Sequence, residues 1–389
     1  MLAGDNPFGK ILSLFQHGIF LGVLLLLIQR NQDTLKTLFR GKIIWLLILM
    51  VPLSSLWSSV PAVTQPRSLA FIETCTFGLY FASRYNLREQ LRLIAWALGI
   101  ASIISLLYTI ALPGHAIENG IHAGAWRGPF IQKNIFSRLL TLSCLVYLCV
   151  KPATNFQKIL VKAALFLSFG LIILTNSKTA LMVIILLVTV WLILRSLRFN
   201  DLLAVPLVLS LFLLVSTAGM AIWVNAESIL GSIGKDLTLS GRTTIWAGLI
   251  EQIKLRPWHG YGYLGFWSNT ESRSLISKIY GTTYNPPHSH NGYIELAIGF
   301  GIIGTILFTL TFLALTRRAA ILTRMNSSRE GLWPLLFLAY LLFYNFSEPT
   351  LIEHNSIFWI IYLSLALSKF LDMPQESSFA NSESISMTS

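Results

Sequence analysis

The chain has 389 residues, of which 54% are hydrophobic and 12% are charged, and its mean hydropathy is +0.65. These values exclude an ordinary soluble domain and predict an all-α polytopic membrane protein. The formal net charge of +12 would suit a nucleic-acid partner, but the cations collect in short loops between apolar runs, as in membrane proteins generally, so we expect no nucleic-acid binding.

Apolar runs close to the roughly 20 residues needed to cross a bilayer recur along most of the chain. They predict about 11–12 transmembrane helices in one integral membrane domain, residues 1–371. The first run lacks a small-residue cleavage site and is followed at once by others, so we expect it to be retained. The runs are centred on residues 11–28, 43–58, 67–82, 93–112, 130–150, 159–175, 179–195, 203–223, 292–316, 332–347 and 351–370.

Lys and Arg are concentrated in alternate connections, beginning with the one that follows the first run. Because positive loops stay in the cytoplasm, the long loop at about 224–290 should lie outside, together with the other connections that are poor in cations. Residues 372–389, rich in Ser, Asn and Glu, should form a disordered cytoplasmic tail.

Several cations stand where charge is costly, at the predicted outer boundary of the membrane. Arg127, Lys133 and Arg138 flank the start of the fifth run, and Lys178 interrupts the chain between the sixth and seventh. Ionisable residues beside spans are candidate functional groups, although such side chains also extend to lipid headgroups for purely structural reasons. If these cations converge, they would bind a strongly anionic group such as a diphosphate.

The outer loop should contain short helices. Apolar residues recur at helical spacing over 243–255, which predicts a helix along the membrane surface that ends at Arg256-Pro257. Ser240 is a suitable N-cap, and Arg242 falls in the first turn, where free N–H groups and a guanidinium together make an anion site. The alternative is that Arg242 is a solvated surface residue.

Two matches to G-x-G-x-x-G occur, at Gly260 to Gly265 and at Gly299 to Gly304. Neither follows a strand, as a dinucleotide-binding fingerprint requires. The second match lies in an apolar run, where glycine allows close approach of neighbouring helices.

His288 and His290 stand where the polar outer loop becomes a long apolar helix, from about Asn291 onward. Histidine exchanges protons readily near neutral pH, and the positive end of the helix dipole disfavours the imidazolium form, so a neutral His290 could act as a base. The pair could instead bind a metal with Glu295 as third ligand, or be structural. Histidines two residues apart share a metal most easily on a strand, so we predict no metal and no cofactor.

The residues around His290 resemble the bacterial O-antigen ligase family. His290-Asn291, nine further residues and then Gly301-Ile-Ile-Gly304 match its H-[NSQ]-x9-G-x-x-[GTY] signature, and the Ser240-Gly-Arg-Thr-Thr-Ile-Trp246 and PWHGYGYLGFW segments are similar to the domain shared with Wzy-type polymerases. The resemblance is clearest from about Lys178 to Thr305. GPFIQKN, which contains Lys133, is similar to the family's G-x-F-x-x-[KR]-N pattern.

The resemblance implies a C-type glycosyltransferase-like membrane fold in the bacterial inner membrane, with a periplasmic active site. His290 would be the base and Arg242 a second catalytic residue, whereas Lys178 replaces an arginine that the family usually has. The donor would be a glycan on undecaprenyl diphosphate and the acceptor the lipid A-core, in a metal-independent, inverting transfer. The residues assigned to the diphosphate or substrate are Lys178, Lys133, Arg127, Arg138, His288 and Asn291.

Two other functions fit the same residues. A polymerase of the same superfamily would break the same bond but use another lipid-linked repeat unit as acceptor. A transporter of a lipid-linked anion would also need cations near the outer boundary, but it would place ionisable residues at mid-bilayer in two repeated halves, which this sequence does not show.

Overall fold

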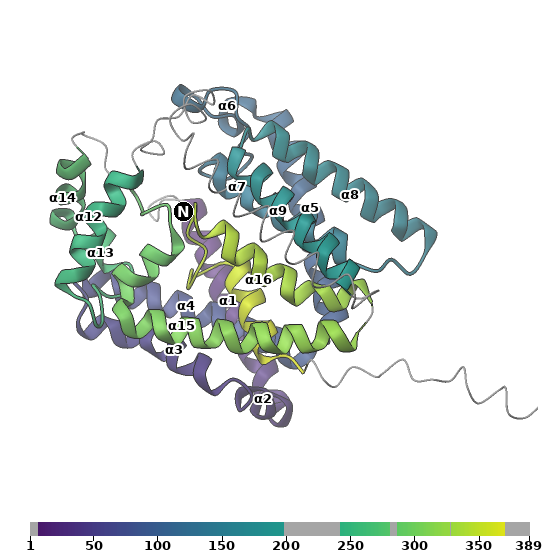
Figure 1. The fold of residues 1–389 in the computed structure, drawn as a ribbon, viewed down its shortest axis with the longest axis horizontal. Helices are drawn as coiled ribbons and strands as arrows, with labels where there is room; N and C mark the ends of the chain where they lie inside the picture. Colours follow the sequence, from purple (N-terminus) through teal and green to yellow (C-terminus); the bar gives the residue numbers. More distant parts are fainter. Residues whose placement is uncertain (1–6, 198–241, 281–285, 327, 370–389) are drawn as a thin grey trace, which may run out of the picture.

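The computed structural model describes residues 7–197, 242–280, 286–326 and 328–369. These residues form helices and no strand, apart from a single β-bridge between Ile117 and Trp126. Figure 1 shows their arrangement. The helices are α1 (Pro7–Gln29), α2 (Asn31–Leu38), α3 (Lys42–Leu53), α4 (Pro61–Arg84), α5 (Leu87–Ala111), α6 (Pro113–Ala116), α7 (Lys133–Cys149), α8 (Asn155–Leu174), α9 (Lys178–Leu197), α12 (Arg242–Leu255), α13 (Gly265–Ser268), α14 (Thr270–Tyr280), α15 (Gly292–Met325), α16 (Trp333–Tyr344) and α17 (Ile357–Leu367).

The all-α polytopic membrane class is confirmed. Each predicted apolar run overlaps a helix except 203–223, which lies outside the described residues. The predicted tail, 372–389, and the part of the predicted outer loop before Arg242, residues 224–241, also lie outside them. By length and composition, four of the described helices could cross a membrane, namely α5, α8, α9 and α15, and α1 with α2 would add a fifth if this pair, bent by 97°, is one span. The total of eleven to twelve spans stays a prediction.

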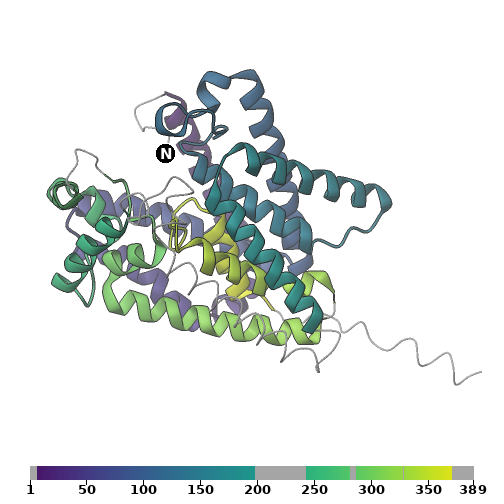
Figure 2. The same ribbon diagram turned by 45° about the horizontal axis from the view of Figure 1, so that its top comes forward.

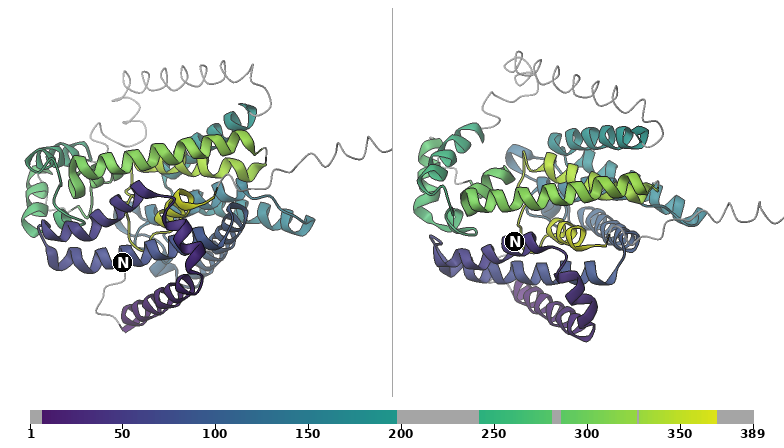
Figure 3. Two further views of the ribbon diagram at one scale, coloured as in Figure 1. Left: turned by 90° about the horizontal axis from the view of Figure 1, so that it is seen from below. Right: turned by 60° about the horizontal axis from the view of Figure 1, so that its bottom comes forward.

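The core of the protein is built on α17. Its side chains pack mainly against α4, and Trp359, Ile361, Tyr362 and Leu363 are almost fully buried. Figure 3 shows this yellow helix in the middle of the assembly, with α15 along one side. Because the last two described helices are enclosed by earlier ones, part of the loop between them, residues 345–356, is buried, including Asn345, Glu348 and Thr350, whereas Phe346 is exposed.

A small group of helices from the outer loop, α12, α13 and α14, packs on the first turns of α15. Ile245 and Leu249 of α12 are buried against Phe266, Ile276 and Ile298. The helix at 243–255 was predicted correctly, and its apolar residues Ile245 and Leu249 cover this small core, while Ile250 of the same stripe is exposed. Its position along the membrane surface stays a prediction.

The two glycine motifs lie against each other. Within α15, Gly301 has non-helical backbone angles (φ 61°, ψ −159°), so the helix is broken there. The main chain of 257–262 fits into the break: Tyr261 N–H donates to Ile298 O at 2.9 Å, and Ile302 N–H donates to Pro257 O at 2.7 Å. A Cβ on Gly301 would lie 2.5 Å from the Trp258 carbonyl. The glycines therefore allow close packing, as predicted, but at Gly301 the segment that approaches is the 257–262 loop and not a neighbouring helix.

Candidate active site

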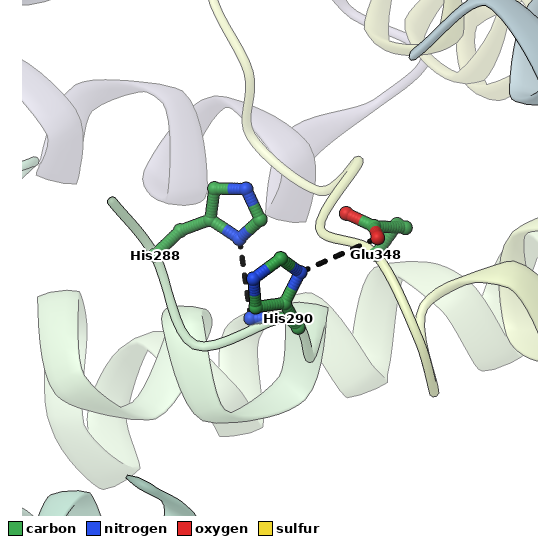
Figure 4. A group of neighbouring side chains, drawn as sticks. All are labelled: His288, His290 and Glu348. Carbon is green, nitrogen blue, oxygen red and sulfur yellow. Dashed lines mark hydrogen bonds and ion pairs between the residues drawn. The ribbon is translucent and has the colours of Figure 1, made fainter. Parts of the chain in front are cut away.

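Glu348, in the loop between α16 and α17, joins three distant parts of the chain. One of its oxygens, Oε1, accepts from Asn134 Nδ2 at 2.8 Å, from His290 Nδ1 at 3.3 Å and from Arg242 Nη2 at 3.5 Å. Its side chain is only 7% exposed, and those of His290 and Arg242 are 14% and 23% exposed. Figure 4 shows His290 in contact with Glu348 through its ring and with His288 through its backbone nitrogen.

The environment keeps Glu348 ionised. Burial by itself would raise the pKa of this carboxyl, but the hydrogen bond from His290 and the charge of Arg242 lower the pKa below its usual value. An ionised carboxylate only accepts hydrogen bonds, so the Nδ1 of His290 must carry a proton. The Nε2 of His290 is then left with a lone pair that can accept one.

The backbone aims His290 at Glu348. His290 has φ 55°, in the left-handed region that non-glycine residues adopt at some energetic cost. The turn is secured on both sides: Ser289 Oγ donates to Asn291 O at 2.8 Å, the Ser289 N–H donates to Glu295, and Trp246 Nε1 donates to Ser289 O at 2.8 Å. Since several contacts hold this unusual conformation, the imidazole is preorganised for its partner.

Glu295 and Asn291 support this turn. Glu295 Oε2 accepts from Trp267 Nε1 at 2.8 Å, so this carboxylate is directed at the turn's backbone and at α13. Asn291 is the N-cap of α15 and accepts from the N–H groups of Tyr293 and Ile294 at 2.9 and 3.2 Å. We assigned Asn291 to substrate binding; the structure gives its side chain a helix-capping role.

His288 lies beside His290, with 4.2 Å between the ring centroids. Its Nδ1 accepts the backbone N–H of His290 at 3.2 Å. Burial lowers the pKa of His288 to about 4. His288 is therefore neutral near pH 7 and can offer a ligand a hydrogen bond from Nε2–H, but not a positive charge.

The cations divide into two groups. Lys133 begins α7 directly before Asn134, and its Nζ donates to Asn176 O at 3.3 Å, two residues before Lys178 at the start of α9. Lys133 and Lys178 are close enough for their charges to repel each other. The structure thus places Lys133 and Lys178 near Asn134, which donates to Glu348.

Arg138 and Arg127 are engaged in structural contacts. Arg138, one turn into α7, pairs with Glu353 at 3.0 Å and donates to Pro349 O at 2.8 Å, and its guanidinium lies over the ring of Phe358. Arg127 donates to Ile131 O, four residues away, at 3.0 Å. Arg138 therefore anchors the same loop that carries Glu348, and Arg127 stiffens its own turn. Neither has a described bond to His290.

His288, His290 and Glu348 each offer a ligand atom, and these atoms lie within 4.8 Å of one another, so we tested whether they suit a divalent cation. They do not. Glu348 Oε1 already receives three donors, including a guanidinium that would repel a metal, and His288 Nδ1 is occupied by a backbone N–H. The carboxylate of this cluster is Glu348, whereas the metal alternative drawn from the sequence used Glu295 as the third ligand.

Sequence reasoning missed Glu348. It stands in a short connection between two apolar runs, Ser347-Glu348-Pro349, and an acidic residue beside a span is costly enough to indicate function. That signal was available, but the connection carries a second acid, Glu353, and only the contacts distinguish them.

Comparisons with known proteins found similarity over part of the chain. Residues 163–309 match the family described as O-antigen ligase, a segment that contains Lys178, Arg242 and both histidines but not Lys133 or Glu348. The exopolysaccharide production protein ExoQ of Rhizobium meliloti is 37% identical over 98 residues, which make up 25% of this chain and 22% of that protein, so the similarity spans about a fifth of the relative's length.

A chain of the solved structure described as "Structural coordination of polymerization and crosslinking by a peptidoglycan synthase complex" is 19% identical, with a TM-score of 0.42; the alignment covers 86% of this chain and 98% of that one. The helical membrane fold identifies this chain as a polytopic membrane protein, and its residues 163–309 are similar to the O-antigen ligase family.

Proposed function

We propose that this protein transfers a glycan from undecaprenyl diphosphate to a sugar hydroxyl at the periplasmic face of the bacterial inner membrane. The observation that carries the proposal is the contact between His290 and Glu348, with Arg242 on the same carboxylate oxygen. It joins a preorganised base to a cation within the segment that matches the ligase family.

His290 acts as the general base. Glu348 holds the proton on Nδ1, so Nε2 accepts the proton of the acceptor hydroxyl as its oxygen attacks the anomeric carbon. The new C–O bond forms as the bond from that carbon to the diphosphate breaks, and direct displacement inverts the anomeric configuration. Glu348 is a positioning residue, because it acts through His290.

Cations stabilise the departing undecaprenyl diphosphate. Arg242 is held at its nitrogens by Ser347 O and Glu348, and Lys133 and Lys178 supply two further ammonium groups. Fixed charges that meet a developing negative charge lower the barrier without reorganisation. The sugar-diphosphate bond already activates the donor, so the transfer needs no metal.

For the acceptor we propose the lipid A-core, which makes the protein an O-antigen ligase. A second candidate is a polymerase, in which the acceptor is another lipid-linked repeat unit. The name of the similar exopolysaccharide production protein ExoQ favours this second candidate. His290, Arg242 and Lys178 serve both equally, because both reactions break the same bond.

A deletion strain distinguishes the two. If the protein is a ligase, long polymer should accumulate on its carrier while the lipopolysaccharide core stays bare. If it is a polymerase, only single repeat units should be transferred. A strain with unaltered glycans and carrier intermediates would contradict both.

The base assignment is tested by His290→Ala in membranes. We expect a loss of transfer of at least roughly a hundred-fold, the contribution usual for a general base, with normal insertion and expression. Near-normal transfer would exclude His290 as the base. Activity should survive EDTA; a loss that a divalent ion restores would contradict the metal-free mechanism.

A further inference from the structure

A groove lies between α5, the end of α7 and α8, away from the histidines. It encloses about 450 Å³, and its walls are largely apolar. Figure 2 shows α8 projecting at one end beyond the helices that it packs against. Trp96 and Ile103 line the groove and are exposed, so it opens toward the surface that α5 presents to the membrane. Its lining includes Trp96, Gly99, Ile103, Tyr147, Leu160 and Ala164.

The hydroxyl groups of Tyr147 and Ser102, two polar residues of the lining, are occupied within the protein. Tyr147 Oη donates to Ala95 O at 2.8 Å, and Ser102 Oγ donates to Leu98 O at 2.8 Å. These groups present carbon atoms to the groove and have no donor left for a polar solute. The interior of the groove therefore suits a hydrocarbon chain.

Two cations stand in the lining. Arg92 lies near the start of α5, and Lys151 follows the end of α7; both are exposed, and no acidic side chain of the described residues pairs with either. No acidic residue lines the groove. An apolar groove with cations at one end is complementary to a lipid with an anionic headgroup, and basic pockets between membrane helices bind such headgroups.

The groove is remote from the candidate active site. Asn134, which binds Glu348, is at the first turn of α7, whereas Lys151 follows the opposite end of this 17-residue helix. A helix of that length spans about 25 Å. The two sites therefore lie near opposite ends of α7, which the apolar run 130–150 predicts to span the membrane, and the groove is not the diphosphate site of the transfer reaction.

We propose that this groove binds one anionic phospholipid from the leaflet opposite the active site. Its phosphate contacts Arg92 and Lys151, and one acyl chain lies between α5 and α8 over the ring of Tyr147. The proposal does not depend on the transfer reaction.

Native mass spectrometry of the purified full-length protein with phosphatidylglycerol tests the headgroup contacts. Arg92→Ala with Lys151→Ala should weaken binding by about thirty-fold, since each cation near an anionic headgroup contributes about a five-fold effect. The control removes two exposed lysines of α8 that do not line the groove, Lys158→Ala with Lys162→Ala, and should bind as the unmodified protein does. Equal losses in both variants, or none in the first, would overturn the proposal.

A second variant tests the acyl chain. Ala163 lines the groove and is exposed, so Ala163→Trp should fill the space without removing a charge. It should reduce phosphatidylglycerol binding while the protein's own thermal unfolding temperature in detergent is unchanged. Inorganic phosphate and phosphatidylcholine should not displace phosphatidylglycerol from the protein. If phosphate displaced it as well as phosphatidylglycerol itself does, or if the Ala163→Trp variant bound phosphatidylglycerol as before, no acyl chain would be bound in the groove.

Discussion

Glu348 determines the chemistry available to His290. The carboxylate receives Asn134 from α7, Arg242 from α12 and His290 from the turn before α15, and each donor comes from a different part of the chain. Replacing it therefore alters proton placement and loop packing together, and a useful experiment must separate them.

Glu348→Gln should lower the turnover number by roughly a hundred-fold or more while changing the Michaelis constant little, because the amide no longer fixes the Nδ1 proton or stabilises the imidazolium. It should also shift the pH profile of turnover, which a purely structural defect would not do. The measurement is glycan transfer in membranes against pH. Glu251→Gln, at an exposed glutamate of α12, is the control; an unaltered pH profile in Glu348→Gln would exclude the positioning role.

Acid should destabilise the protein through two buried histidines. Burial lowers the pKa of His288 and of His354 to about 4, and the charge of Arg67 adds to the effect at His354. Between about pH 6.5 and 4 the unfolded chain binds more protons than the folded one, so the free energy of unfolding falls as pH falls. The loss should be on the order of 2 kcal/mol for each histidine, allowing for partial exposure.

The thermal unfolding temperature between pH 7 and 4 measures this effect. The geometry fixes the tautomer of His354: Arg67 donates to Nε2 at 3.0 Å, so Nδ1–H donates to Tyr263 Oη at 3.0 Å. His354→Gln should flatten the pH dependence, whereas His122→Gln, at an exposed site, should leave it as it is. Equal slopes for both variants would disprove the assignment.

Among the elements, the broken helix α15 connects the site to the membrane. Its first turns carry Asn291 and Glu295, which hold the histidine turn, and they pack on α12 and α13; beyond Gly301 the helix continues beside α3. The break lets the 257–262 main chain hydrogen-bond directly to α15. The position of His290 therefore depends on a glycine eleven residues away.

Gly301→Ala should destabilise the protein by about 3 kcal/mol, because the new Cβ would collide with the Trp258 main chain and the residue would have to keep φ at 61°. The thermal unfolding temperature in detergent is the measurement. Gly170→Ala in α8 is the matched control, since no atom lies within 4 Å of its Cβ position, and helix propensity favours alanine by about 1 kcal/mol. If Gly301→Ala lowered the free energy of unfolding by less than about 1 kcal/mol, the packing argument would be refuted.

Across the whole molecule, the two ends of α7 define two faces. One end holds Asn134 near Glu348, and the other leads to Lys151 and the lipid groove. The distribution of Lys and Arg predicts that the first face is periplasmic and the second cytoplasmic. The three native cysteines are buried, so an introduced cysteine can report this orientation.

An impermeant maleimide applied to intact spheroplasts should label Trp258→Cys, at an exposed residue beside α15, and should label Lys151→Cys only after the membrane is permeabilised. The unsubstituted protein measures the background. The reverse pattern would invert the predicted topology and place the histidines in the cytoplasm.

The sequence by itself determined the class and the positions of the long helices, and it indicated His290 and Arg242 as candidate site residues, because apolar runs, loop charges and a spaced motif are all local patterns. Even the helix at 243–255 could be predicted, from the periodicity of its apolar residues. These features need no knowledge of distant neighbours.

Only the tertiary structure decided which polar residues meet. Glu348 is separated from His290 by 58 residues, and its role follows from the packing of α16 and α17 inside the other helices. The same packing occupies Arg138 with Glu353 and directs Glu295 at a backbone turn. Charge alone did not distinguish the five cations. Their partners, which depend on contacts between remote segments, separate Lys133 and Lys178, near Asn134, from Arg127 and Arg138, which bond to the main chain and to Glu353.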